Sequence, residues 1–336
     1  MARYIAKRLM LAALMALLAS CVIFLITNLV PGDPVLAQLG DIAASDPAIV
    51  ARWRAKWGLD LPLWDRYLIF LGGLLQGDLG ISIATHRPVL DDIRQYAPAT
   101  IELATIAFLL SLILGIPLGI AAAVWRDRWI DSAARALSLL GVSAPTFWLA
   151  FMMLAIFYGG LGWAPGPGRI DPIAFPPEGP TGLFLFDSLW TGDWESFWDC
   201  LAHLVLPAIV LAAATVGLIT RTTRAAMLDS LQQDYVRVSR AKGLREWTII
   251  LRHALPNALV PVVTLGGLAY AQLLAGAVMT ETVFSWPGLG RYTFTSAAAL
   301  DFPAIVGITL IVSLTFLLVN LAVDVSYAII DPRVRR

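Results

Sequence analysis

Six long apolar runs divide this chain and restrict what it can fold into. They cover residues 9–30, 99–125, 136–163, 201–220, 258–280 and 302–323. Each has about the 20 residues that a helix needs to cross the hydrocarbon core of a bilayer. In lipid every backbone polar group needs an internal partner, and a helix supplies one along its whole length. The sequence therefore predicts an all-α membrane protein with six transmembrane helices.

The amino-acid composition agrees with membrane insertion. Hydrophobic residues make up 58% of the chain and charged residues 14%, whereas a soluble domain has about 45–50% apolar and about 25% charged residues. The formal net charge is zero, which argues against a nucleic-acid partner. Cys21 and Cys200 are too few for a disulfide framework or a metal cluster.

The first apolar run follows Arg3, Lys7 and Arg8, so a cleaved signal peptide is the alternative interpretation. Residues 18–21 (LASC) even resemble a lipoprotein cleavage site. The apolar run continues past Cys21 to residue 30, however, where a mature lipoprotein would become polar. We therefore expect this first span to be retained.

Lysine and arginine positions predict the orientation, because they collect in cytoplasmic segments. Six spans place both termini on one side, together with the connections 126–135 and 221–256. These regions hold most of the basic residues, and the 164–200 loop on the other side has only Arg169 among several acidic residues. Both termini and residues 221–256 are predicted to face the cytoplasm, and residues 31–98 and 164–200 to face outward.

The two outward segments differ in composition. Residues 31–98 are mixed and charged, with aromatics that include Trp64 and Tyr67, and they are expected to form a partly helical segment on the membrane interface. The 164–200 loop is rich in proline and glycine at its start and aromatic later. This loop could cover the outer mouth of a pathway, form a docking surface or act as an interfacial cap.

The stretch 221–256 is the longest polar and basic segment between two apolar runs. Leu228, Leu231, Tyr235 and Val238 recur at steps of three and four, which predicts one face of a helix. Gly243 then allows a sharp turn, and a short second helix is predicted over 244–251. A helix–glycine–helix unit between two spans suggests a projection that a soluble protein grips.

Several chemical motifs are missing from the sequence. The three lysines, Lys7, Lys56 and Lys242, are not followed by serine or threonine, so no phosphate-binding P-loop is possible. The histidines are scattered, at positions 86, 203 and 253, without the spacing of a zinc site. No Ser/His/Asp or Cys/His arrangement stands out. The sequence indicates a chain that is not an enzyme and has no metal or cofactor site of its own.

Polar groups inside the spans are also few. Glu102 and Asp324 lie near span ends, and Gln272 lies within the fifth span. Intramembrane polar residues are functional candidates, but without a row of carboxylates a proton-driven or sodium-driven relay has little support. The sequence therefore points to an external energy source.

The stretch 221–256 resembles the cytoplasmic loop of bacterial ATP-binding-cassette importer permeases. That loop has a Glu-Ala-Ala triplet, a glycine three residues later, and Ile-x-Leu-Pro after nine more. Gly243, Leu255 and Pro256 occupy matching positions. Residues 237–239 (RVS) replace the triplet and His253 replaces the isoleucine, which departs from the general pattern.

One branch of that family, the dipeptide/oligopeptide/nickel permeases, is more similar. DYVRVSRAKGL and RHALPNAL look like its loop, and so do LVPGDPV after the first span, GDLGISI and RPV within 77–89, and ETVFSWPGLGR at 281–291. The C-terminal NLAVDVSYAIIDPRVR also resembles that branch. The acidic and aromatic 164–200 loop looks most like the dipeptide-type subunit.

The resemblance implies a single permease domain over 1–336 in the bacterial cytoplasmic (inner) membrane. It comprises an N-terminal tail and span (1–30), an extracytoplasmic segment between helices 1 and 2 (31–98) and a five-helix core (99–336). The core includes the outer loop 164–200 and a cytoplasmic coupling loop, 221–256, with its coupling helix.

The implied function is translocation of di- or oligopeptides that an external binding protein delivers. Separate subunits hold ATP and Mg²⁺ and hydrolyse the nucleotide. The implied partners are a second homologous permease subunit, two cytoplasmic ATPase subunits, an extracytoplasmic substrate-binding protein and membrane lipid. Alternatives are import of a nickel complex or other small solute by the same mechanism, an ion-driven secondary carrier, and a membrane scaffold that transports nothing.

The resemblance also implies which residues couple to the ATPase: Arg240, Ala241, Lys242, Gly243, Leu244, Arg245, Glu246, Trp247, Ile250, Leu255 and Pro256. Leu244, Trp247 and Ile250 are expected to supply the apolar contact, with charged residues at its rim. The substrate path is expected along the fourth and fifth spans, at Thr264, Tyr270 and Gln272.

Overall fold

The computed structural model describes residues 2–29, 47–48, 51–52 and 61–330. The named elements of these residues are helices: α1 (Ala2–Leu29), α4 (Leu63–Leu75), α5 (Val89–Val124), α6 (Trp129–Ser143), α7 (Thr146–Met153), η1 (Leu154–Gly160), α8 (Phe184–Thr191), α9 (Trp194–Leu231), α10 (Asp234–Ala241), α11 (Glu246–Thr248), η2 (Ile249–Ala254), α12 (Leu255–Gly276), α13 (Val278–Val283), α14 (Leu289–Ala298) and α15 (Phe302–Ile330). Much of the predicted 31–98 segment, including most of LVPGDPV, lies outside the described residues, as do residues 331–336.

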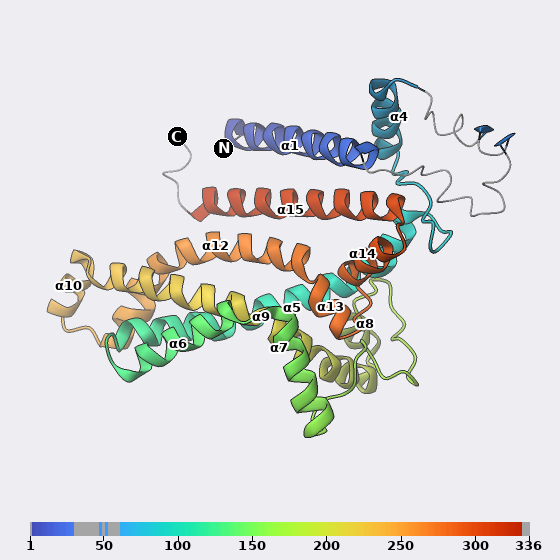
Figure 1. The fold of residues 1–336 in the computed structure, drawn as a ribbon. Coiled ribbons are helices and arrows are strands. Elements are labelled where there is room, and N and C mark those ends of the chain that lie inside the picture. Colours follow the sequence, from blue (N-terminus) through green and yellow to red (C-terminus); the bar gives the residue numbers. More distant parts are fainter. Residues whose placement is uncertain (1, 30–46, 49–50, 53–60, 331–336) are drawn as a thin grey trace.

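The all-α membrane fold is confirmed for the described part of the chain. Five helical stretches are long and apolar enough to cross a membrane: Ala6–Ile26, Val89–Val124, Trp194–Leu231, Glu246–Ala275 and Phe302–Val323. A sixth span results if α6 and the helix formed by α7 and η1, which are bent relative to each other, are counted as one span. The long helices lie roughly side by side, with α1 against α15 (Figure 1).

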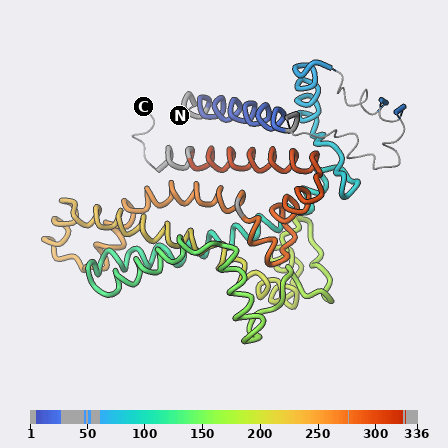
Figure 2. The backbone as a smooth tube through the Cα atoms, in the orientation of Figure 1, coloured from blue at the N-terminus to red at the C-terminus, as the bar shows by residue number. Residues whose placement is uncertain are grey.

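The two ends of the bundle carry different elements. The start of α1 and the end of α15 lie toward the same end as α10, whereas α4, α8 and α14 lie toward the other end (Figures 1 and 2). This arrangement requires an even number of crossings, which the chain has when the bent pair α6–α7 counts as one span. The prediction that both termini share a side with residues 221–256 therefore agrees with the path of the chain.

The third predicted span, 136–163, is not one straight helix. It consists of α6 and α7, which meet at an angle of 102°, and α7 leaves the layer of long helices (Figure 1). Between the two helices, Ala144 has an extended backbone. The cause is Pro145, which follows it, because proline lacks an N–H and disfavours a helical conformation in the residue before it. The prediction of a continuous span was wrong here, and the bend opens space between α6, α7 and α9.

Two spans are longer than predicted. The helix α5 begins at Val89 instead of residue 99, with Asp91 and Asp92 in its first turn. Carboxylates at this position stabilise a helix through their interaction with its dipole. The helix α9 has 38 residues, or about 57 Å at 1.5 Å per residue. Asp193 caps α9 by accepting from the Ser196 amide, and hydrogen bonds from Ser196 hold the pKa of Asp193 below its usual range. The length of α9 exceeds the ~30 Å hydrocarbon core, so α9 is long enough to reach from one membrane surface to the other.

Small residues let α5 and α9 approach closely. A Cβ atom added at Gly115 would lie 2.8 Å from Ile219 Cγ2, and one at Gly119 would lie 2.5 Å from Thr223 Cβ. Such distances are shorter than real Cβ contacts, so these positions exclude any side chain without a shift of the helices. Close packing of small residues is how membrane helices associate when lipid is as apolar as their side chains.

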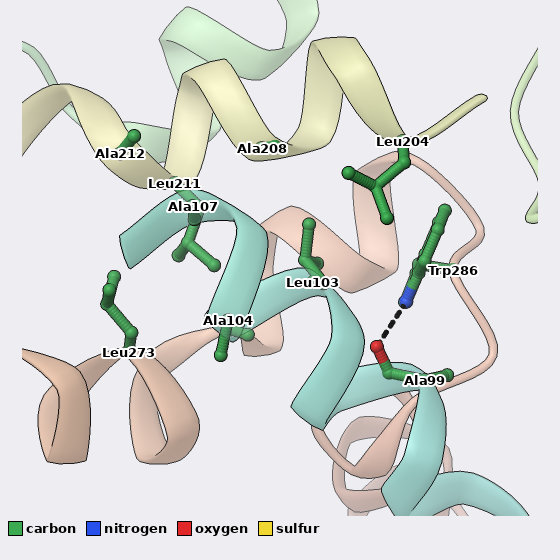
Figure 3. Packing of buried hydrophobic residues seen from close by; sticks show 11 residues of the cluster. Ala99, Leu103, Ala104, Ala107, Leu204, Ala208, Leu211, Ala212, Leu273 and Trp286 are labelled. Atoms are coloured by element: carbon green, nitrogen blue, oxygen red, sulfur yellow. Dashed lines mark hydrogen bonds between the residues drawn. The ribbon is translucent and has the colours of Figure 1, made fainter. Parts of the chain in front are cut away.

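The motif at 281–291 fastens the end of the bundle at which α4 and α14 lie (Figure 1). Trp286 is fully buried in a cluster from α5, α9 and α12, and its indole N–H donates to the Ala99 carbonyl at 2.9 Å (Figure 3). The Glu281 carboxylate accepts from the Thr100 hydroxyl at 2.6 Å and from the Arg291 amide at 3.0 Å. Burial raises the pKa of Glu281 to about 7. This motif therefore joins α13 and α14 to α5.

A buried ion pair fixes the outer loop. Arg169 donates two hydrogen bonds to Glu102 Oε2, at 3.0 and 2.6 Å, and one to the Gly182 carbonyl. Its guanidinium carbon lies 3.6 Å from the centroid of the Phe184 ring. Since both charged side chains are buried, the 164–200 loop is tied to α5 at its base, while Trp190 and Trp198 remain exposed on it.

Candidate functional site

The polar stretch 221–256, here called the coupling segment, begins as the last turns of α9. An ion pair anchors these turns: Arg224 donates to both oxygens of Asp131 on α6, at 2.7 and 2.8 Å. Asp131 is fully buried, and it also accepts from the Asp127 amide at 3.1 Å. The two hydrogen bonds match the fork of the guanidinium. The start of the coupling segment is therefore joined firmly to the bundle.

The predicted helical stripe through the coupling segment is interrupted. The helix α9 ends at Leu231, and the amides of Gln232 and Gln233 bond to carbonyls three residues earlier, which closes the helix. A new helix, α10, then buries Val236 and leaves Val238 exposed. The expectation that Leu228, Leu231, Tyr235 and Val238 share one helix face was wrong, because this break changes the register.

The break is held by polar contacts. The hydroxyls of Tyr235 and Ser230 hydrogen-bond to each other at 2.6 Å, and the Asn257 amide donates to Tyr235 at 3.0 Å. The Ser230 hydroxyl also donates to the Ala254 carbonyl at 2.9 Å. Together these bonds connect the end of α9, the start of α10 and the start of α12.

Gly243 ends α10 in a left-handed conformation with φ of 73°. The Gly243 amide bonds to the Arg240 carbonyl at 2.9 Å and the Leu244 amide to the Ser239 carbonyl at 3.3 Å. This pair of bonds is the Schellman pattern, in which a glycine with positive φ closes a helix. The expected turn at Gly243 is therefore present, and it reverses the chain.

The second helix starts at Glu246 and does not stop at 251. It passes through the π-helical turn η2 and continues into α12, with Pro256 in the first turn of α12, where the missing N–H costs little. The guanidinium of Arg240 donates to both carboxylate oxygens of Glu246, at 2.9 and 3.3 Å, across the Gly243 turn. This pair is exposed, so it contributes little stability but aligns the two helices.

Ile250 is placed differently from the sequence-based expectation. It is 4% exposed and packs with Met227 and Ala123 in a cluster between α5, α9 and α12. The reason is the π-helical turn, which sets Ile249 and Ile250 against the chain's own core. Ile250 is therefore not part of the accessible surface, and the expectation that it contacts a partner is not supported by its position.

The remaining implied residues form one exposed projection, which we call the knob. All of its residues are exposed: Arg240, Ala241, Lys242, Gly243, Leu244, Arg245, Glu246 and Trp247. Trp247 is 57% exposed and Leu244 is 41% exposed. Leu255 is partly buried behind the knob, and Pro256 is exposed in the turn that follows η2. Large apolar side chains surrounded by charges at the tip of a fixed turn suit an interface with another protein.

The three residues expected along the substrate path do not form one group. The Thr264 hydroxyl donates to the Val260 carbonyl at 3.1 Å. The hydroxyls of Tyr270 and Thr105 hydrogen-bond at 3.0 Å, and the Tyr270 ring packs against Phe108. Gln272 instead lines a cavity of about 180 Å³ beside the bend between α6 and α7. Of the three, Gln272 alone borders this cavity.

Metal chemistry finds no support in the part of the chain that the structure describes. There, no group of three or more His, Cys, Asp and Glu side chains could hold a metal ion. His203, buried in the first part of α9, contacts the Asp199 carbonyl at 2.9 Å. The hydrogen-bond partner of this histidine therefore lies on α9 itself.

Comparison with protein families gives two matches that together cover nearly the whole chain. Residues 115–336 match the family described as binding-protein-dependent transport system inner membrane component. Residues 1–104 match the N-terminal region of the binding-protein-dependent transport system membrane component.

Individual relatives are similar along almost their full length. The probable D,D-dipeptide transport system permease protein of Escherichia coli K12 is 50% identical over 317 residues, which are 94% of this chain and 93% of that protein. The di/tripeptide transport system permease protein of Pseudomonas aeruginosa is 40% identical, covering 100% of this chain and 99% of that protein. The glutathione transport system permease protein of Escherichia coli O6:H1 is 36% identical over the same shares.

Among solved structures, a chain of the inward-facing MetNI methionine ABC transporter has the same fold. The TM-score is 0.50 with 19% sequence identity, and the match covers 69% of this chain and 93% of that chain. The likeness supports the arrangement of the helices.

Proposed function

Because this chain belongs to the family of binding-protein-dependent transport system inner membrane components, we propose that it is the permease subunit of an ATP-binding-cassette importer for di- and oligopeptides. Relatives at 40–50% identity carry names of dipeptide or di/tripeptide transport. A relative named for glutathione transport is less similar, at 36%. These names support a short peptide as the solute more than a nickel complex.

The single observation that carries the mechanism is the knob at 240–247. An ATPase subunit binds it in a groove, with Leu244 and Trp247 as the buried apolar contact and Arg245 and Lys242 at the rim. The Schellman turn at Gly243 and the Arg240–Glu246 pair hold the knob in one shape. A projection of fixed shape transmits movement of the groove instead of absorbing it.

The bundle gives that movement a route to the outer side. The helix α9 runs from the coupling segment to the outer loop without interruption, and Arg224 ties it to α6. ATP binding draws the ATPases together, the knobs follow, and the spans rock from an inward-open to an outward-open arrangement. Packed interfaces switch between discrete arrangements, which suits such a rocking motion. Hydrolysis then resets the spans.

Each partner in the proposed complex has a separate task. Two ATPase subunits hold ATP and Mg²⁺ and perform hydrolysis, so this chain has no catalytic role. A second homologous permease subunit completes the pathway, and an extracytoplasmic binding protein delivers the peptide. This chain contributes the membrane-spanning conduit and the knob.

The proposed orientation places the coupling segment and both termini in the cytoplasm. Support comes from the arginines of the coupling segment and of 126–135, compared with the mainly acidic 164–200 loop. The start of α1 and the end of α15 also lie toward the same end as α10 (Figure 1). The family is one of inner membrane components, and in the proposed orientation the 164–200 loop faces the extracytoplasmic side.

Reconstitution tests this function directly. The chain is combined with the second permease, the ATPases and the binding protein in liposomes, and uptake of a radiolabelled dipeptide is measured. Uptake is expected to require both ATP on the ATPase side and the binding protein on the opposite side. Omitting the binding protein or replacing ATP with a non-hydrolysable analogue provides the controls. Equal accumulation without nucleotide, or accumulation driven by an ion gradient alone, would contradict the proposal.

A further inference from the structure

The cavity beside the bend between α6 and α7 opens to the surface of the chain, where its lining residues Thr146, Ala214 and Gln272 are exposed. Its volume is about 180 Å³, and its wall comes from α6, α7, α9 and α12. It borders α9 near the middle of that helix, at Leu211 and Thr215. A water molecule occupies about 30 Å³, so the cavity has room for several waters or for a solute group of similar total size.

Three polar side chains line this cavity: Thr146 at the start of α7, Thr215 on α9 and Gln272 on α12. The remaining lining residues are glycine, alanine, leucine and valine. The polar residues thus come from three helices that are far apart in sequence. Such convergence of a few polar groups in a mainly apolar pocket is typical of small-molecule sites.

Thr215 is the buried member of this set of three polar residues. Thr215 is 7% exposed, yet no described residue forms a hydrogen bond with its hydroxyl. Elsewhere in the spans, Thr264 and Thr309 donate to the carbonyl four residues earlier. An unpaired hydroxyl in an apolar environment costs free energy, and the cavity is the space from which a bound group can reach the Thr215 hydroxyl.

Thr146 and Gln272, in contrast, are exposed at the open side of the cavity. Neither forms a side-chain hydrogen bond with any other residue that the structure describes. A hydroxyl can donate and accept, and a primary amide offers two donors and one acceptor. The cavity therefore presents donors and acceptors together, and none of its lining residues is ionisable.

This set of groups complements a neutral amide. A peptide bond has one N–H donor and one C=O acceptor, which the three side chains can satisfy together. No lining residue is a counter-ion for a charged peptide terminus, and burying an unpaired charge is costly, so the termini of a dipeptide bound here must point out of the open side of the cavity, where Thr146 and Gln272 are exposed. We propose that Thr146, Thr215 and Gln272 form a transient binding site for the peptide bond of the transported substrate. This proposal rests on the function proposed above.

An amide site of this kind explains how the permease can pass many sequences. It recognises the backbone that all short peptides share and makes no specific contact with their side chains. The hydrogen bonds are few and neutral, so the site holds the peptide weakly and releases it readily.

The first test removes the polar groups one at a time in the reconstituted complex. Thr215→Val keeps the shape and removes the hydroxyl, Gln272→Leu removes the amide, and Thr215→Ser keeps a hydroxyl as the conservative variant. Thr309→Val is the matched control, because the Thr309 hydroxyl already donates to the Ile305 carbonyl. Dipeptide uptake and ATP hydrolysis are measured together at saturating binding protein.

Uptake per ATP hydrolysed is expected to fall about tenfold for Thr215→Val and Gln272→Leu, on the order of one lost buried hydrogen bond. Thr215→Ser and Thr309→Val should stay within about twofold of wild type. Binding-protein-stimulated ATP hydrolysis should persist in all variants, which shows that the complexes are assembled. Wild-type uptake in both Thr215→Val and Gln272→Leu would overturn the site and leave the proposed function intact. Failure of the wild-type complex to import any peptide would instead overturn the function, and the site with it.

The second test determines whether the site recognises the amide group of the peptide bond. A dipeptide and its ester analogue, which lacks the N–H, are compared in wild type and in Gln272→Leu. The wild-type complex is expected to prefer the amide more strongly than the variant does. An identical preference in both would place the discrimination in the binding protein, show that the cavity holds water only, and overturn the assignment.

Discussion

Replacing Gly243 with proline or Trp247 with glutamate is expected to separate ATP hydrolysis from peptide uptake while the chain still inserts into the membrane. Proline fixes φ near −65°, whereas Gly243 has φ of 73°, so Gly243→Pro destroys the turn that shapes the knob. Trp247→Glu places a charge in the apolar contact with the ATPase. Loss of such a central aromatic contact costs about 2 kcal/mol or more, so uptake should fall at least about 30-fold.

Two matched variants control for these changes. Asparagine tolerates the left-handed conformation, and the space around an added Cβ at Gly243 is open, so Gly243→Asn should retain most uptake. Trp247→Phe keeps an aromatic contact and should lose less than Trp247→Glu. The measurement is uptake per ATP hydrolysed, with the amount of membrane-inserted chain determined in parallel. Wild-type uptake in Gly243→Pro or Trp247→Glu would refute the coupling role of the knob.

The second large effect concerns the ion pair beneath the outer loop. Arg169→Met leaves the buried Glu102 carboxylate without its cation, and breaking a buried pair in this way costs about 3–5 kcal/mol. The variant also loses the contact between the guanidinium and Phe184. We expect a markedly lower unfolding temperature in detergent and faster proteolysis within 164–200.

Arg94→Met is the comparison for this experiment. Arg94 pairs with Asp91 on an exposed helix face, where such pairs contribute about 0–1 kcal/mol, so its unfolding temperature should barely change. Adding Glu102→Gln to Arg169→Met should recover part of the lost stability, because no unpaired charge then remains. If Arg169→Met unfolds at the wild-type temperature, the pair does not fasten the loop.

The spans could be predicted from the sequence because each carries its own signal. A run of about 20 apolar residues meets the requirement of the bilayer regardless of what surrounds it. The start of α5 could not be placed in this way, since Asp91 and Asp92 are polar yet helical. The sharp bend at Pro145 was missed as well, because a proline in a membrane helix is often accommodated by its neighbours. The packing of α7 against α9 and α13 decides this case.

The knob was largely predictable for the same reason. The turn at Gly243 depends on local backbone preference, and the exposure of Trp247 follows from the polar residues around it. The burial of Ile250 depends on a π-helical turn and on contact with Met227, far away in the sequence. The cavity residue Thr215 gave no signal, because a threonine in a span normally bonds to its own helix.

Cross-linking at residue 247 tests the central claim, that ATPases drive this conduit from the cytoplasmic side through the knob. The chain carries Trp247→Cys in a background with Cys21→Ser and Cys200→Ser, and it is assembled with its partners in vesicles of known orientation. We predict that a membrane-impermeant thiol reagent reaches position 247 from the cytoplasmic face alone, that bound ATPase blocks the reagent, and that a short cross-linker joins this position to the ATPase. Labelling from the outer face, or equal labelling with and without the ATPase, would contradict the account.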